Sequence, residues 1–216
     1  MITRIRLVVA TAVLASLAGC AIVGKKEPLS LYAPEATVQP DAAWPQVDWA
    51  LQIPRPHANE LVDSPRIVVR PADGELQVYH GAIWAEPAPD IVQDAVLRAF
   101  EDSGHIGSVT RRGAGVNGEY ELLLDIRTFE SDYAGGATPN ADVEIVAKLI
   151  ANRGNVVVAT RVLKQRAPAA STKVGDVSRA FDVALTAVVQ DLVGWALVEG
   201  EKYDKAHPSP LAPLKR

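Results

Sequence analysis

The chain has 216 residues and a formal net charge of −4, and 48% of its residues are hydrophobic. This apolar content is enough for a folded core and argues against an intrinsically disordered protein. The acidic balance gives the surface as a whole no electrostatic reason to bind nucleic acid or anionic head groups.

The first twenty residues have the organisation of a secretory signal peptide. A basic head with Arg4 and Arg6 precedes an uncharged apolar run at 7–17, and small residues then lead to Cys20. The apolar run is too short to span a bilayer as a helix. The ending from Leu17 to Cys20 resembles the bacterial lipoprotein signal. An ordinary signal peptide that happens to contain a cysteine is the alternative.

The lipoprotein resemblance implies removal of residues 1–19 and acyl chains, palmitate among them, on the thiol and the new amino group of Cys20. Two or more such chains anchor a protein stably in a membrane. Ala21, in place of Asp, resembles the outer-membrane sorting class of enteric bacteria. Cys20 is the only cysteine, so the chain has no disulfide framework. Acylation would also leave no thiol for a cysteine nucleophile.

Residues 20–45 are interrupted repeatedly by proline, which predicts a flexible tether between the membrane and the domain. Within this tether, 29–32 is a candidate for a short strand. A single periplasmic domain is expected over 46–202. The segment 203–216 lacks periodicity and is rich in proline, which predicts a disordered tail.

Strands open the expected domain. Alternating apolar residues predict strands at 47–53, 66–70 and 75–79. The segment 81–87, which contains Trp84, is expected to be a connection.

The first helix is predicted at 89–103, where apolar residues recur at helical spacing. Pro89 suits its first turn, and Gly104 suits its C-terminal cap.

Three further strands are predicted at 119–130, 142–150 and 156–164. A hairpin turn at 152–155 joins the last two, because Gly and Asn there tolerate positive φ. Within the last strand, the alternation places every second residue from Val156 to Val162 on one face.

A second helix is predicted at 176–199, with Asp176 as a plausible N-cap and Gly200 as a stop. The element order predicts an α+β two-layer domain. Its mixed or antiparallel sheet would have about five to six strands, with two main helices packed on one face.

The sequence contains no recognisable catalytic or metal-binding constellation. The four histidines, at positions 57, 80, 105 and 207, are scattered without metal-ligand spacing. The glycine-rich segment 113–118 opens a strand rather than a helix and lacks the lysine of a P-loop, so we interpret it as a turn.

Two charged sets have both a functional and a structural interpretation, and we favour the structural one for each. Carboxylates near the 119–130 strand fit paired catalytic acids or a solvated sheet face. They are Glu119, Glu121, Asp125, Glu130 and Asp132. Arginines of several strands fit an anion site or cross-strand ion pairs with these acids. They are Arg66, Arg70, Arg111, Arg112 and Arg127.

Tyr79, Ile83 and Trp84 form an apolar cluster before the first helix. Such a cluster is either part of the core or a contact patch of the kind that aromatic residues make at interfaces. These three residues are the candidate partner-binding site.

The order and spacing of several segments resemble the ABC-type transport auxiliary lipoproteins, the PqiC-like group. The resemblance begins with the lipoprotein signal and covers roughly 29–200. It is carried by the segments 31–34, 51–56, 58–70, 76–79, 84–85, 99–104 and 120–130 and by the last helix.

The resemblance implies a non-catalytic outer-membrane lipoprotein that faces the periplasm, without a cofactor. It would work beside an inner-membrane ABC transporter and an MCE-type lipid-binding protein, in systems that move phospholipids and maintain membrane integrity. A homo-oligomer is left open. The alternatives are a lipoprotein activator of a peptidoglycan synthase and a periplasmic hydrolase, which would need a cleft with convergent polar groups.

Overall fold

The computed structural model describes residues 28–115 and 118–208, which form one mixed nine-stranded sheet and two helices. The strands are β1 (Ser30–Tyr32), β2 (Val47–Ile53), β3 (His57–Ala58), β4 (Arg66–Arg70), β5 (Gln77–Trp84), β6 (Ile106–Arg111), β7 (Tyr120–Asp132), β8 (Asn140–Ala151) and β9 (Val156–Pro168). The helices are α2 (Ala88–Ser103) and α3 (Val174–Ala206). The expected signal peptide, Cys20 and most of the expected tail lie outside the described residues.

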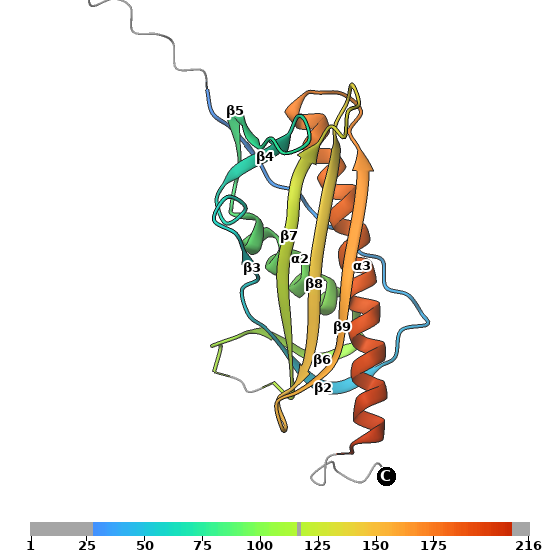
Figure 1. Cartoon of the computed structure of the whole chain (residues 1–216). Coiled ribbons are helices and arrows are strands. Elements are labelled where there is room, and N and C mark those ends of the chain that lie inside the picture. Colours follow the sequence, from blue (N-terminus) through green and yellow to red (C-terminus); the bar gives the residue numbers. More distant parts are fainter. Residues whose placement is uncertain (1–27, 116–117, 209–216) are drawn as a thin grey trace, which may run out of the picture.

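Strand β7 is the centre of the sheet. One edge of β7 pairs antiparallel with β8 along its whole length, and β8 pairs antiparallel with β9. The other edge of β7 pairs in turn with β2, β3 and β4, all parallel. Strand β2 also pairs with β6, and β4 leads through β5 to β1. Both helices lie behind the long strands on one face of the sheet (Figure 1).

A bulge keeps both halves of β7 facing the helices. Leu122, Leu124 and Ile126 alternate onto the buried face, and the register with β8 then shifts by one residue before Thr128. The extra residue puts Phe129 on the same face as Ile126. Without it, strict alternation would turn the second half of the strand toward the outer face.

Aromatic rings fill the core where β5, β7 and α3 meet. The ring of Trp84 lies 5.8 Å from that of Phe129 and 5.0 Å from that of Phe181, both edge-on. All three side chains are almost completely buried. Edge-to-face packing at these distances is favourable beyond the area it buries.

Two glycines of α3 allow a close approach of tryptophans from the N-terminal part of the chain. A Cβ atom at Gly194 would lie 2.5 Å from Trp44 Nε1, and one at Gly200 would lie 2.5 Å from Trp49 Cζ2. Glycine costs helix stability, so close packing explains its presence at these two positions.

Residues 35–39, here called the strap, run along α3 as an extended segment. The backbone N–H groups of Glu35, Thr37 and Gln39 donate to the side chains of Asp182, Thr186 and Gln190 at 3.0, 3.1 and 3.1 Å. Four helical residues rise about 6 Å and two extended residues span about 6.6 Å, so the two spacings match.

The α+β class, the element order and the two helices on one face are confirmed, but five to six strands was too few. Strands β3 and β6 were missed, because β3 has two residues and β6 contains Gly107 and lacks clear alternation. The expected connection at 81–87 was also wrong, because β5 continues to Trp84.

The predicted tether is corrected over its described part. Strand β1 pairs with β5, and the strap is bonded to α3, so the fold begins near residue 30 rather than 46. Helix α3 runs to Ala206, past the predicted stop at Gly200 and into the expected tail, and its N-cap is Lys173 rather than Asp176.

The predicted face of β9 is also corrected. A register shift between Leu149 and Ile150 of β8 inserts an extra residue near Val158 of β9. Beyond this bulge the alternation is reversed, so Val162 is exposed while Leu163 is buried.

Candidate functional site

The structure separates the three residues of the predicted partner-binding cluster. Trp84 is 1% exposed and belongs to the core. Tyr79 and Ile83 are half-buried, and the Tyr79 hydroxyl lies 3.0 Å from Ser131 Oγ. Burial raises the pKa of the Tyr79 phenol. Trp84 is therefore unavailable to a partner, and a binding role for Tyr79 and Ile83 stays a prediction.

Four of the five arginines considered for an anion site form ion pairs with acids on neighbouring elements, as the structural interpretation predicts. These pairs are Arg70–Glu130 at 2.6 Å, Arg111–Asp94 at 2.6 Å, Arg112–Glu121 at 3.5 Å and Arg127–Glu144 at 3.7 Å.

The carboxylates along β7 also have ion-pair or hydrogen-bond partners on neighbouring segments. Asp132 shares the guanidinium of Arg166 with Asp142, at 2.7 and 2.6 Å. Asp125 lies 3.1 Å from His57 Nδ1, and Glu119 accepts the N–H of Ala50 at 2.6 Å. Paired in this way, the carboxylates hold strands together rather than lining a common cleft.

Arg55, which was not among the arginines expected at an anion site, joins two segments of the domain. Its guanidinium donates to both oxygens of Asp63 at 2.7 and 2.9 Å, and it reaches Asp90 in the first turn of α2 at 2.7 Å. The hydrogen bonds from Arg55 hold the pKa of Asp63 below its ordinary value. These hydrogen bonds connect the β3–β4 connection to the start of α2.

Of the remaining sequence candidates, the histidines do not converge. His57 contacts Asp125, His105 lies edge-on to Trp44 with ring centroids 6.0 Å apart, and His207 stacks on Tyr203 at 4.2 Å. Within residues 28–115 and 118–208, no three His, Cys, Asp or Glu side chains are arranged to hold a metal ion. Gly113 and Gly115 have positive φ, as a turn requires.

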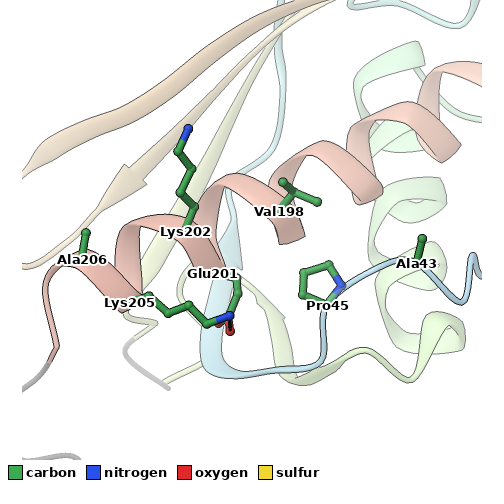
Figure 2. A pocket seen from close by; sticks show the side chains of 7 residues that line it. All are labelled: Ala43, Pro45, Val198, Glu201, Lys202, Lys205 and Ala206. Carbon is green, nitrogen blue, oxygen red and sulfur yellow. Dashed lines mark ion pairs between the residues drawn. The ribbon is translucent and has the colours of Figure 1, made fainter.

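A groove of about 640 Å³ lies at the C-terminal end of α3. Ala43 and Pro45 form one wall, and α3 residues from Val198 to Ala206 form the other (Figure 2). Glu201 and Lys205 of this wall pair with each other at 2.8 Å. The groove is at the opposite end of the molecule from the point where the chain enters at residue 28 (Figure 1).

Helix α3 is long and apolar enough to cross a membrane by length and composition, with a mean hydropathy of 1.6 over its most apolar window. Half of that window is buried in the protein, and Phe181, Leu185 and Val188 are 0% exposed. The apolar stripe of α3 thus packs against β8 and β9 as a core helix.

The described domain matches a known protein family and a solved structure over most of its length. The family model for ABC-type transport auxiliary lipoprotein components matches residues 29–193. The crystal structure of protein XCC0632 from Xanthomonas campestris, of family DUF330, is 48% identical with a TM-score of 0.79. The alignment covers 82% of this chain and 99% of that one.

Two further matches are more distant. The structure of an uncharacterized protein, 9% identical with a TM-score of 0.59, covers 77% of this chain and 97% of its own and shows the same fold alone. The uncharacterized protein bll6063 of Bradyrhizobium diazoefficiens is 25% identical over 149 residues, 69% of this chain. The present chain spans 40% of that relative's length.

Proposed function

The chain belongs to the ABC-type transport auxiliary lipoprotein family, and we propose that it is a non-catalytic subunit of an envelope lipid-transport system. In this proposal Cys20 is acylated and holds the domain on the periplasmic face of the outer membrane. The domain docks an MCE-type protein and, through it, the inner-membrane ABC transporter. The cargo is phospholipid or a similar hydrophobic molecule.

The family match carries this proposal, because it extends over residues 29–193 and so includes the strap, the sheet and most of α3. Support for a non-catalytic role comes from the side chains that sequence reasoning offered for chemistry. They are committed to structural pairs such as Arg70–Glu130 and Asp132–Arg166. A hydrolase would need such groups to converge in a cleft.

The position of β1 defines how such a subunit would be held. Because β1 begins at Ser30, nine residues separate it from Cys20, a span of at most about 35 Å. The 33 residues of α3 extend for about 50 Å. The groove at the far end of α3 therefore points away from the anchor, toward a partner that approaches from the inner membrane.

Deletion and rescue in the native bacterium test the function. Loss of the protein should make the envelope more permeable to detergents and hydrophobic dyes, and the wild-type chain should restore the barrier. Cys20→Ala, which removes the acylation site, should not. If deletion leaves permeability unchanged and instead sensitises cells to inhibitors of wall synthesis, the lipid-transport role is wrong and an activator of a peptidoglycan synthase is favoured.

A further inference from the structure

Large hydrophobic side chains are exposed around the edge strand β1 and the start of β5. Leu29, Leu31, Leu76 and Val78 are 54%, 64%, 45% and 41% exposed. Leu29 immediately precedes β1, and Leu76 immediately precedes β5. We refer to these four residues as the edge patch.

The strand registers place the patch on one face. Leu31 and Arg66 both lie opposite Ile83, and Val78 lies opposite Val68. The register shift between these two β4–β5 pairs adds its extra residues to β5, so the alternation within β4 is not interrupted. Paired residues share a face, and so do alternate residues such as Arg66 and Val68. The neighbouring Trp84 points into the core, so the patch residues Leu31 and Val78 face away from the helices.

The edge patch lies where the described part of the chain begins. Figure 1 shows the N-terminal segment passing beside β5, at the end of the domain that carries the β4–β5 loop. Only eight residues separate Leu29 from Cys20, at most about 30 Å of chain. A short linker of this kind holds the patch at high effective concentration near the surface into which the anchor inserts.

We propose that the edge patch lies against the lipid bilayer that receives the acyl chains of Cys20. The contact is apolar rather than electrostatic, because Asp73 and Glu75 in the β4–β5 loop offset the exposed Arg66 on the same face. The chain from Cys20 onward also has 20 basic against 26 acidic residues. Seated this way, the patch sets the orientation of the domain, with the groove at the far end of α3 directed away from the lipid. This inference rests on the proposed acylation of Cys20.

Site-directed fluorescence on the acylated full-length protein tests the contact. Because Cys20 is the only native cysteine and its thiol is acylated in the proposal, a cysteine introduced as Leu31→Cys or Leu76→Cys carries a unique environment-sensitive label. The protein is reconstituted in vesicles of phosphatidylethanolamine and phosphatidylglycerol with brominated acyl chains as quenchers. Val157→Cys, on the β8–β9 hairpin and 54% exposed, is the matched control.

The expected result is loss of emission at both patch positions and none at Val157. The loss should persist in 1 M salt, where the screening length falls to about 3 Å and surface electrostatics fade. If the protein is acylated and bound to vesicles but the patch labels are not quenched, the inference is wrong while the proposed function still stands. Labels shielded from water but not quenched by bromine would also overturn the inference, since a protein surface would then cover the patch. Intact mass without acyl chains would instead refute the anchoring in the proposed function.

Discussion

At the scale of single residues, the close contacts between glycines of α3 and tryptophans decide where the N-terminal part of the chain packs. Gly200 sits in the middle of a helical turn, where the sequence pattern indicated a stop. The structural reason for glycine is the indole of Trp49, which occupies the space a side chain would need. A position chosen for tertiary packing can thus resemble a helix terminus in sequence.

Gly200→Ala should therefore destabilise the domain by about 1–3 kcal/mol, although alanine favours helix by about 1 kcal/mol at an open site. Gly175→Ala is the control, because a Cβ there meets nothing closer than 3.8 Å. It should be neutral or stabilising. Urea unfolding of both variants measures the difference, and equal stabilities would contradict the packing argument.

The pair of Arg55 and Asp63 gives a pH dependence. Its hydrogen bonds lower the folded-state pKa of Asp63 beneath the ordinary 3.8, so the pair contributes stability above pH 3.8. That contribution is lost as the pH falls through the lower folded-state pKa.

Asp63→Asn should lower the free energy of unfolding at neutral pH by up to about 1 kcal/mol, as is typical of partly exposed pairs. The difference from wild type should shrink as the pH drops below 3.8. Thermal unfolding across this range measures it, and a difference that is independent of pH would show that the Asp63 carboxylate is not the cause.

At the scale of elements, the strap shows that part of the expected tether belongs to the folded domain. Prolines at positions 34, 40 and 45 indicated a tether, but the backbone of this segment finds its partners on α3. The polar residues Asp182, Thr186 and Gln190 recur every four residues and form a ladder that no local pattern in 35–39 could reveal. Burial raises the pKa of Asp182, and the N–H of Glu35 offsets part of this effect.

Thr186→Val should weaken the strap by about 1 kcal/mol, because it removes the acceptor of the Thr37 N–H. Hydrogen exchange at 35–39 should become faster while exchange in the sheet stays the same. Thr186→Ser, which keeps the hydroxyl acceptor of the Thr37 N–H, is the control and should leave the strap unchanged. Unaltered exchange in Thr186→Val would mean that the ladder does not hold the segment.

The strands show where alternation is reliable and where it fails. The predicted strand 142–150 is contained in β8, and all of the predicted strand 119–130 except its first residue lies in β7. The faces of β9 were wrong because one bulge inverts the pattern, and a bulge is specified by pairing with the neighbouring strand rather than by the strand itself. The short β3 and the Gly-containing β6 depend on pairing with β7 and β2 for the same reason.

At the scale of the whole molecule, the α+β layers followed from the order of apolar patterns, and the family followed from the spacing of its segments. The candidate partner-binding site was predicted less well from the sequence. Tyr79, Ile83 and Trp84 were grouped because they are near in sequence, yet alternation and the close packing of Phe181 send Trp84 into the core. The exposed leucines nearby come from strands far apart in sequence, so their grouping depends on the β1–β5 pairing.

Co-purification from native envelopes tests the central claim of docking most directly. The tagged, acylated protein is recovered from gently solubilised envelopes, and its partners are identified by mass spectrometry. Two variants of exposed valines on α3 accompany it: Val198→Glu inside the groove and Val183→Glu outside it.

We expect wild type and Val183→Glu to recover an MCE-type protein or its ABC transporter, and we expect Cys20→Ala and Val198→Glu to lose most of this recovery. Recovery of a peptidoglycan synthase in its place, or of neither partner by the wild-type protein, would contradict the docking role.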